Sequence, residues 1–544
     1  MGNSILRLPK AYNEPVKQYR PGSPEREMLK AELNRQLNEV RDIPLIINGK
    51  EIRTADQKQV TCPHDHKKVL AEFSNAGRPE VEAAIAAALN ASKQWEEMPW
   101  QERASVFLKA ADLISQKYRY VINAATMLGQ SKNSFQAEID ATCELVDFYR
   151  FNARYMEEIY KNQPTSDRGI WNRIEYRALE GFVFALTPFN FTAIAGNLGG
   201  APALMGNTVV WKPASTAVLS GYYIMKILQE AGLPDGVINF IPGKGSVVGE
   251  SVLNHKDLAG IHFTGSTKVF KTLWKTVGKN IDIYRSYPRV VGETGGKDFI
   301  FMHPTADAGQ VVTAAVRGAF EYQGQKCSAC SRMYIPASQW DEVTDRLKTE
   351  IAKITMGDVT EFSHFMNAVI DETSFDNVAG YIKRAEQSND AGILTGGKAD
   401  KSKGYFIEPT VIVAEDPHYE SMTQEIFGPV LTIYRYDDEA LDKALTLVDT
   451  SSAYALTGAV FARDRQAIDK MTRALTHCAG NFYINDKPTG SVVGQQPFGG
   501  ARASGTNDKA GSMLNMLRWT SARTIKENFV SPEDFAYPFM ESDD

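Results

Sequence analysis

The 544-residue chain is 43% hydrophobic and 23% charged and has a formal net charge of −6, so it is long enough for several domains with large buried cores. The acidic balance and the lack of a basic run argue against nucleic acid as a partner. Five cysteines, an odd and sparse set for this length, argue against a disulfide framework and favour a reducing compartment.

Segment 1–27 mixes charges and prolines. It has neither the apolar core of a signal peptide nor the Arg-rich, acid-poor composition of an organelle presequence. We therefore expect a cytoplasmic protein, and a processed mitochondrial matrix form fits the same sequence.

Apolar residues at three- and four-residue spacing predict helices over 81–89, 103–118 and 137–160. From 181 to 211 the chain carries no charge over a length that could span a bilayer, but two prolines and five glycines interrupt it. A lipid-exposed helix would leave such breaks unsatisfied. We therefore expect a buried strand, turn, helix and strand, and no membrane contact.

Apolar runs at 182–186, 208–211, 237–241 and 260–263 alternate with helix-like segments such as 218–230. This alternation predicts a parallel sheet with crossover helices, whose ligands bind at the carboxyl ends of the strands. A second alternating region runs from 307 to about 475. Its helices over 311–322 and 340–354 and its strand over 455–462 predict a second α/β domain.

Two further segments, 163–180 and 517–525, alternate apolar and polar residues as strands do. They lie outside both domains. Pairing with another subunit and a flap over the chain's own core both remain open for them.

Four motifs follow one another along the chain: TPFNF at 187–191, VGETGGK at 291–297, GQKC at 324–327 and EIFGPV at 425–430. Taken singly, Cys327 would be interpreted as a small buried hydrophobe, and Glu293 and Asn190 as turn residues. Their joint occurrence in one order favours a shared catalytic site.

With WKP at 211–213 and FTGS at 263–266 between them, these motifs resemble the signatures of the aldehyde dehydrogenase superfamily. Cys327 lies 34 positions after Glu293, which also fits that family. The resemblance covers nearly the whole chain after residue 45.

The resemblance implies an α/β fold with a Rossmann-like dinucleotide-binding domain, a second α/β catalytic domain and a small β oligomerisation flap. The expected division is an N-terminal arm (1–44), the NAD-binding domain (45–162 and 181–293), the catalytic domain (294–480), a substrate-anchor loop region (481–511), and the flap with the C-terminal tail (163–180 and 512–544). A homodimer or a larger homo-oligomer is expected.

The chemistry of aldehyde oxidation explains the three catalytic residues that the resemblance implies. A thiolate of Cys327 adds to the carbonyl and forms an alkoxide that can expel hydride to a nicotinamide. The Asn190 amide and the Cys327 backbone N–H stabilise that oxyanion. Glu293 then acts as the general base that activates water to hydrolyse the thioester.

A standard Gly-x-Gly-x-x-Gly fingerprint is absent, as it is in the resembled family. The resemblance implies NAD as cofactor, held by residues of several motifs: Thr187, Lys212, Ser215, Gly265, Ser266, Glu425 and Phe427. Gly265-Ser266 would place the pyrophosphate at the start of a helix, whose free N–H groups favour anions. Ser215 stands where many NAD-preferring members carry glutamate, so NADP is not excluded.

Flanking residues, above all TGS at 489–491, GQQPFGG at 494–500 and ARASGTN at 501–507, resemble the pyrroline-5-carboxylate dehydrogenase branch. That branch acts in proline degradation on glutamate semialdehyde, a small molecule with a carboxylate and an ammonium group remote from the aldehyde. The implied substrate residues are Ser328, Gly490 and Ser491 for the carboxylate, Phe191 and Phe498 for the methylenes, and Glu144 near the ammonium or the water.

Three alternative functions account for part of these motifs. An aldehyde dehydrogenase for another carboxylated aldehyde, such as succinate semialdehyde, would share Cys327, Glu293 and Asn190. A non-catalytic relative should have lost the nucleophile or the base, and a fused proline-oxidising enzyme needs a flavin barrel for which this chain has no room. The Cys327–Cys330 pair has no second pair of cysteines to complete a metal site, so we expect no metal and a packing role for Cys330.

Overall fold

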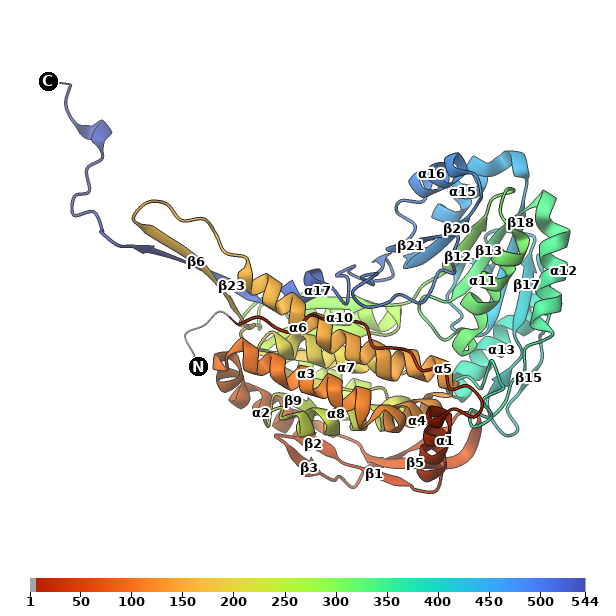
Figure 1. The fold of residues 1–544 in the computed structure, drawn as a ribbon, viewed down its shortest axis with the longest axis horizontal. Helices are drawn as coiled ribbons and strands as arrows, with labels where there is room; N and C mark the ends of the chain where they lie inside the picture. Colours follow the sequence, from red (N-terminus) through yellow and green to blue (C-terminus); the bar gives the residue numbers. More distant parts are fainter. Residues whose placement is uncertain (1–5, 544) are drawn as a thin grey trace.

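The uncharged segment 181–211 forms strand β7 (Phe182–Leu186), helix α7 (Thr192–Leu204) and strand β8 (Thr208–Lys212), as the sequence predicts. These elements lie at the centre of the first of two α/β domains in the computed structural model, which describes residues 6–543 (Figure 1). Across residues 6–543, none of the helices combines the length and the apolar character that a membrane crossing needs.

The first sheet has seven strands in the order β11-β10-β7-β8-β9-β2-β3. The five strands from β11 to β9 run parallel to one another. Strand β2 is antiparallel to β9, and the edge strand β3 is antiparallel to β2. Besides β7 and β8, its strands are β2 (Leu45–Ile47), β3 (Lys50–Ile52), β9 (Ile238–Phe240), β10 (Leu258–Thr264) and β11 (Arg289–Glu293). All seven residues of β10 are buried, as expected for a parallel strand covered on both faces.

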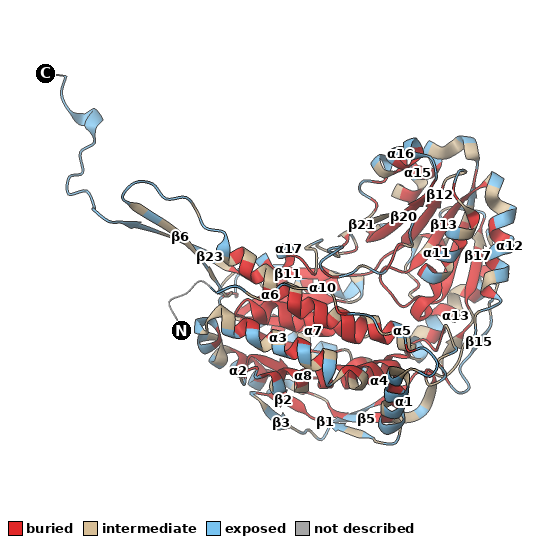
Figure 2. Ribbon diagram, in the orientation of Figure 1, coloured by how far each residue is buried: buried red, intermediate tan, exposed pale blue. Residues whose placement is uncertain are grey.

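Helices cover both faces of this sheet. One apolar core joins the sheet to α3 (Trp100–Gln116), α4 (Arg119–Gln130), α6 (Leu145–Lys161), α7 and α8 (Val218–Ala231). A second core on the other face joins it to α2 (Arg78–Glu97), α9 (Gly245–Leu253) and α10 (Thr267–Lys279). Figure 2 shows the buried residues concentrated in these layers.

The second sheet also has seven strands, in the order β14-β17-β18-β13-β12-β20-β21, and only β14 runs antiparallel to its neighbour. The strands are β12 (Asp298–Met302), β13 (Cys330–Pro336), β14 (Ala391–Thr395), β17 (Thr410–Ala414), β18 (Val430–Tyr436), β20 (Thr457–Phe461) and β21 (Asn481–Ile484). Helices α11 (Ala308–Phe320) and α12 (Trp340–Ile351) pack in one core, and α15 (Leu441–Thr450) and α16 (Arg465–Ala474) in another. Helix α13 (Glu372–Glu386) covers one end of the sheet. The predicted second α/β domain is therefore confirmed.

The predicted helix over 137–160 is interrupted near its start. After α5 (Ser134–Ala137) the chain forms a π-helical turn, Glu138–Glu144, before α6 begins. Such turns widen a helix by one residue and are frequent at functional sites. The predicted helix over 311–322 ends at Phe320, because Tyr322 and Gln323 adopt left-handed backbone angles with φ of 51° and 55°.

The two segments outside the domains pair with each other. Strands β6 (Ile170–Arg177) and β23 (Ser521–Asn528) form an antiparallel ribbon that projects from the first domain and continues into the C-terminal tail (Figure 1). A flap over the chain's own core is therefore wrong. The start of the predicted strand 517–525 is also wrong, since Leu517 ends helix α17 (Met513–Leu517).

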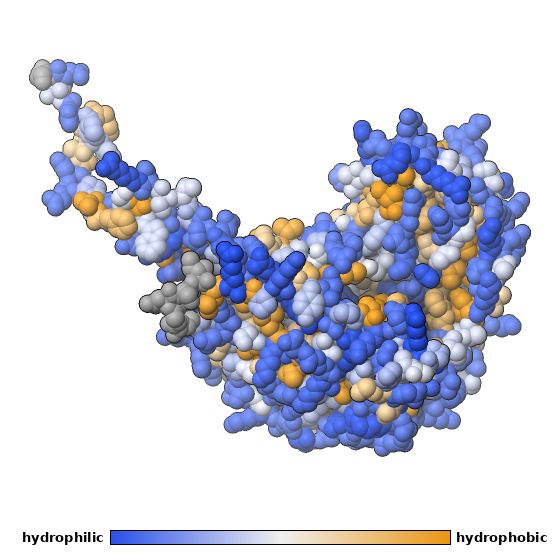
Figure 3. Space-filling view, in the orientation of Figure 1, coloured by the Kyte–Doolittle hydropathy of each residue, from blue (hydrophilic) through white to orange (hydrophobic). Residues whose placement is uncertain are grey.

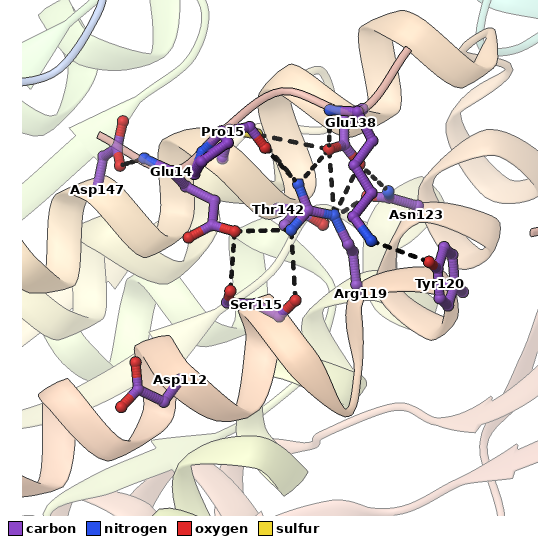
Figure 4. Close-up of polar contacts among 12 residues, drawn as sticks. Glu14, Pro15, Asp112, Ser115, Arg119, Tyr120, Asn123, Glu138, Thr142 and Asp147 are labelled. Carbon is purple, nitrogen blue, oxygen red and sulfur yellow. Dashed lines mark hydrogen bonds and ion pairs between the residues drawn. The ribbon is translucent and has the colours of Figure 1, made fainter. Parts of the chain in front are cut away.

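An N-terminal arm runs along the helices of the first domain before α1 (Pro24–Leu37) begins. Glu14 of the arm receives a hydrogen bond from Arg119 (Figure 4). It receives another from Arg150, and Tyr19 donates one to Glu138 at 2.6 Å. A small sheet of β1 (Arg41–Ile43), β5 (Asp65–Ser74) and β4 (Gln57–Cys62) follows. The turn between β4 and β5 contacts the second domain, where Tyr405 N donates to Pro63 O at 3.0 Å.

The remaining elements are short. They are β15 (Ala399–Asp400), β16 (Phe406–Ile407), β19 (Tyr454–Ala455), β22 (Ala501–Arg502), α14 (Glu420–Thr423), and the 3₁₀ turns Ser215–Ala217, Glu321–Gly324, Ala337–Gln339, Asp438–Ala440 and Pro538–Met540.

Candidate active site

The carboxyl ends of four adjacent strands of the first sheet carry the predicted site residues of that domain. The register pairs Leu186 with Lys212, Phe263 with Leu186, and Thr264 with Glu293, so β8, β7, β10 and β11 end at one level. The loops that follow them hold Thr187 to Phe191, Pro213 to Ser215, and Gly265-Ser266, and Lys212 is the last residue of β8. The predicted site residues of this domain therefore lie at the carboxyl edge of the first sheet.

The second sheet contributes loops from the opposite edge. Cys327 lies just before β13, and Glu425 and Phe427 lie just before β18, so these residues stand at the amino ends of their strands. The two domains face each other, so that the carboxyl edge of the first sheet meets the amino edge of the second.

Direct contacts join the two halves. The Asn190 Nδ2 donates to Gln325 O at 3.1 Å, two residues before Cys327. On the other side, Gly296 N donates to Glu425 Oε1 at 3.0 Å, and a Cβ on Gly296 would lie 2.2 Å from Cys327 O. The Gly295-Gly296 turn therefore lies between the nucleophile loop and the Glu425 carboxylate.

The Cys327 side chain is buried, with 8% of its surface exposed. Burial raises the pKa of its thiol well above the usual value, and the nearby carboxylates of Asp298, Glu425 and Glu293 raise it further. The resting group is therefore a thiol, and it needs a base to become a nucleophile.

The Glu293 side chain is positioned to serve as that base at the end of β11. Its Oε2 accepts the Gly500 N–H at 2.8 Å, and burial raises its pKa well above the usual value, while Gly500 and the Lys509 ammonium oppose this shift. A carboxyl group with a raised pKa accepts protons more readily near neutral pH.

Polar side chains from α4 and the π-helical turn fix the loop that carries Asn190. Gln130 Nε2 donates to Phe189 O at 2.5 Å, and Asp140 accepts the N–H groups of Thr192 and Ala193 at 3.0 and 2.9 Å. Lys132 completes this support. Its Nζ lies 2.7 Å from Asp140 Oδ2 and 4.0 Å from the centre of the Phe191 ring.

The residues predicted to hold the dinucleotide surround the opening between the sheets. Lys212 is buried, its Nζ donates to Pro213 O at 2.9 Å, and burial lowers its pKa to about 8. Burial raises the pKa of Glu425 to about 7. Phe427, at φ 61°, packs edge-on against Phe189 with ring centres 5.9 Å apart.

Gly265 and Ser266, the residues predicted for the pyrophosphate, directly precede helix α10. Ser266 caps this helix, its hydroxyl accepting the Val269 N–H at 3.3 Å, and other N–H groups of the first turn have no partner within the helix. Ser215 is exposed in the turn after β8. The Thr187 hydroxyl accepts the Trp211 indole N–H at 3.0 Å. Buried polar groups and a helix N-terminus at one opening fit a dinucleotide.

The residues predicted to hold the carboxylate lie in two neighbouring loops. Ser328 Oγ lies 2.8 Å from Thr489 Oγ1, and Ser491 Oγ lies 3.0 Å from the Tyr483 hydroxyl. Gly490 has φ +95°, a backbone angle that favours glycine. Phe498 lies in the same loop region, where its N–H donates to Ala510 O at 3.0 Å.

Glu144 ends the π-helical turn. Burial raises the pKa of its carboxyl to about 8, with Asp140 acting in the same direction and Lys132 and Lys326 opposing it. The turn thus places one acid, Asp140, under the Asn190 loop and another, Glu144, within electrostatic reach of the nucleophile loop.

The groups that support the predicted catalytic side chains were not themselves predicted: Gln130, Lys132, Asp140, the Gly500 N–H and Lys509. Lys132 and Asp140 are eight positions apart, Lys132 outside the predicted helices and Asp140 inside the one over 137–160. Neither spacing nor charge pattern singles them out, because their partnership depends on the π-helical turn and on the approach of α7.

Comparisons with known proteins agree with these motifs. The model of the aldehyde dehydrogenase family matches residues 52–525. The mitochondrial delta-1-pyrroline-5-carboxylate dehydrogenase of Dictyostelium discoideum is 55% identical over 98% of this chain and 96% of its own, and the human protein of that name is 49% identical over 98% and 95%. The crystal structure of the delta-pyrroline-5-carboxylate dehydrogenase from Mycobacterium tuberculosis bound with NAD is 50% identical and matches with a TM-score of 0.96, covering 99% of this chain and all of that one.

Proposed function

The chain belongs to the aldehyde dehydrogenase family, and from this premise we propose how its residues carry out the reaction. The protein is an NAD-dependent dehydrogenase that oxidises L-glutamate 5-semialdehyde, the open form of 1-pyrroline-5-carboxylate, to L-glutamate in proline degradation. The observation that supports the residue roles is the meeting of Cys327, Asn190 and Glu293 between the two sheets.

Cys327 attacks first. Its thiol loses a proton to a base, for which Glu293 is the candidate, and the sulfur bonds to the aldehyde carbon while the carbonyl oxygen becomes an alkoxide. The Asn190 amide and the Cys327 backbone N–H donate to that oxygen. Loss of one such donor typically costs about 3–4 kcal/mol in the transition state.

The cofactor, when bound, supplies the acceptor for the hydride that leaves the substrate carbon. Lys212 and Glu425 are the residues that would hold its two riboses, Gly265-Ser266 and the start of α10 its pyrophosphate, and Phe427 the nicotinamide ring. Thr187 and Ser215 border the same opening. The buried carboxylate of Glu425 and the buried amine of Lys212 each keep free hydrogen-bonding capacity for hydroxyl groups.

The thioester left on Cys327 must be hydrolysed. Glu293 takes a proton from water as the oxygen bonds to the thioester carbon, and the carbon–sulfur bond breaks to give the carboxylate and the free thiol. The Glu293 carboxylate accepts the Gly500 N–H through Oε2, which leaves Oε1 to accept the proton from water.

Substrate recognition uses both ends of the molecule. Ser328, Gly490 and Ser491 would hold the carboxylate, Glu144 would lie near the ammonium, and Phe191 and Phe498 would pack the methylenes. Glu144 is the residue that separates this substrate from succinate semialdehyde, which has no ammonium group.

The test is NAD reduction by the purified protein with pyrroline-5-carboxylate and with succinate semialdehyde. The wild-type protein should prefer pyrroline-5-carboxylate, and Cys327→Ala should abolish the reaction while Cys330→Ala retains it. Equal or better turnover of succinate semialdehyde would contradict the role of Glu144, and activity in Cys327→Ala would contradict the nucleophile.

The finer organisation completes the proposal. We propose the domain boundaries expected from the sequence for the arm (1–44), the NAD-binding domain, the catalytic domain, the anchor loop region and the flap. We also propose that the β6–β23 ribbon pairs with a second copy of the chain in a homodimer or larger homo-oligomer. The relatives from Dictyostelium discoideum and human are named as mitochondrial proteins, so a cytoplasmic protein and a matrix form are both compatible with the sequence.

A further inference from the structure

Two lysines and one glutamate lie behind the loop that we assign to the substrate carboxylate. Lys326 Nζ donates to Glu321 Oε2 at 3.2 Å, and Lys487 Nζ lies 4.0 Å from the same oxygen. The side chain of Lys326 is 4% exposed and that of Lys487 is 25% exposed. The Glu321 carboxylate thus lies near the ammonium groups of both Lys326 and Lys487, so positive charge exceeds negative charge in this cluster.

Lys487 is the member of this cluster that touches the anchor loop. Its Nζ donates to Thr489 O at 3.4 Å, and a Cβ on Gly490 would lie only 2.9 Å from that Nζ. Thr489 in turn shares a hydrogen bond of 2.8 Å with Ser328. The ammonium, the Gly490 backbone and the Ser328 hydroxyl therefore lie together.

Neighbouring carboxyl groups leave this positive charge in place. Glu321 is divided between the two lysines, and Arg317 also lies within electrostatic reach of it. Glu144 faces Lys326, but its pKa of about 8 keeps it largely protonated at neutral pH.

The anchor needs such a charge. The donors so far assigned to the carboxylate, two hydroxyls and one N–H, are neutral, and an ammonium nearby adds a direct Coulomb attraction that neutral donors do not supply. The chain's net charge of −6 also repels an anionic substrate at long range, so capture depends on local cations.

We propose that Lys487 is a specificity-determining residue for aldehydes with a remote carboxylate: its ammonium, tethered to Glu321 beside Lys326, attracts the carboxylate onto the Gly490 turn. The inference rests on the proposed function, because it takes the Ser328–Gly490–Ser491 loop as the carboxylate site. The aldehyde carbon and Cys327 play no part in it, so the charge acts on binding and not on the chemical steps.

The experiment compares Lys487→Met with the wild-type protein on three aldehydes: pyrroline-5-carboxylate, succinate semialdehyde and uncharged butanal. The methionine variant should raise KM for the two carboxylated aldehydes about 5- to 30-fold, with kcat nearly unchanged, because a partly screened charge contributes on this scale. Its kcat/KM for butanal should equal that of the wild type. Lys487→Arg should restore most of the binding of the carboxylated aldehydes.

The matched control is Lys470→Met, which removes another lysine of the second domain that pairs with a carboxylate, Asp442, at 2.7 Å. It should change none of the three KM values. A second measurement needs no variant: raising the ionic strength from about 0.05 M to about 0.5 M should raise KM of the wild type for the carboxylated aldehydes and not for butanal.

Unchanged KM values for both carboxylated aldehydes in Lys487→Met would overturn the inference. So would an equal loss for butanal, which would mean that Lys487 only supports the turn. The proposed function fails differently: a wild-type protein that turns over butanal and not pyrroline-5-carboxylate would contradict the substrate itself.

Discussion

At the scale of single residues, the proposed general base is held by a loop that lies far from it in sequence. Glu293 accepts the Gly500 N–H at 2.8 Å, and the Lys509 ammonium, which donates to Gly480 O at 2.7 Å, acts on it electrostatically. Burial raises the pKa of Glu293 more than these groups lower it. Because a general base acts in its ionised form, the hydrolysis step should speed up as pH rises through this raised pKa.

The variant Glu293→Gln tests this role. Amides accept protons poorly, so hydrolysis of the thioester should slow by about 10²- to 10⁴-fold. If another group can deprotonate Cys327, a first burst of NADH should remain and its size should equal the number of active sites. Stopped-flow absorbance over a pH series measures both the burst and the steady state.

Two results would speak against that role. One is a steady-state rate in Glu293→Gln equal to that of the wild type. The other is a wild-type hydrolysis rate that falls, instead of rising, between about pH 6 and pH 8.

Glu144 leads to a second prediction about pH. Its pKa of about 8 means that the carboxyl is mostly protonated below that pH and becomes a carboxylate above it. Only the carboxylate can pair with the substrate ammonium, so KM for pyrroline-5-carboxylate should fall as pH rises toward 8. Initial rates in the wild type and in Glu144→Gln measure this, and the variant should show a higher KM without that fall. The same pH profile in both proteins would exclude Glu144 as the titrating group.

Residue chemistry decided which parts of the site could be predicted. Cys327, Glu293 and Asn190 could be predicted because each sits in a short motif that resembles the signatures of the family. Lys132 and Asp140 could not, because neither belongs to such a motif, and their ion pair exists where the end of α4, the π-helical turn and α7 meet. Contacts of this kind depend on packing and leave no local pattern.

At the scale of elements, the N-terminal arm is fastened by charges that are almost fully buried. Arg119, with 3% of its side chain exposed, donates to Glu14 of the arm at 2.7 Å and also pairs with Glu138 of the π-helical turn (Figure 4). Tyr19 and Asn123 donate to the second oxygen of Glu138. The arm therefore braces the turn that ends in Glu144.

The variant Arg119→Met should destabilise the protein strongly. It leaves the buried Glu138 carboxylate without a cation and leaves Glu14 with Arg150 alone, and breaking a buried pair in this way costs about 3–5 kcal/mol. A lower midpoint of thermal unfolding and faster proteolysis of the arm are the expected readouts. KM for pyrroline-5-carboxylate should also rise, because Glu144 loses its support.

The matched control is Arg35→Met. Arg35 pairs with Glu39 at 2.6 Å at the surface, where its side chain is 44% exposed, so the change should cost at most about 1 kcal/mol. Equal midpoints of thermal unfolding for Arg119→Met and Arg35→Met would show that burial of the ion pairs does not determine how strongly the arm is attached.

At the scale of the whole molecule, the strands of the two sheets were largely predictable and their arrangement was not. The apolar run at 182–186 coincides with β7 because a strand buried on both faces must be apolar throughout. The site, however, lies where the carboxyl edge of one sheet meets the amino edge of the other, and this depends on how two domains pack. Nothing local in the sequence around Cys327 or Glu425 specifies which edge of its sheet it will occupy.

The projecting ribbon makes the last prediction. Strands β6 and β23 pair only with each other, so each presents an unpaired edge, and exposed edges readily add a strand from another chain. Apolar side chains are exposed along the ribbon and the tail, as the orange patches in Figure 3 show, and they include Trp171, Phe529 and Phe535 at 50%, 63% and 85% exposure. Exposed apolar surface of this kind marks protein interfaces.

Two truncated variants test the contributions of the ribbon edge and of the C-terminal tail separately. Ending the chain at Thr520 removes β23 and should convert the proposed homo-oligomer into monomers. Ending it at Asn528 keeps the ribbon, removes only the tail and should weaken association without abolishing it. Light scattering coupled to size-exclusion chromatography measures the mass across a concentration series. Met28→Ser, which removes a 54% exposed apolar side chain on α1, is the control and should leave the mass unchanged. An unchanged mass after truncation at Thr520 would place the subunit contact elsewhere. A monomer after truncation at Thr520, together with a weakened oligomer after truncation at Asn528, would assign the primary contact to the ribbon edge.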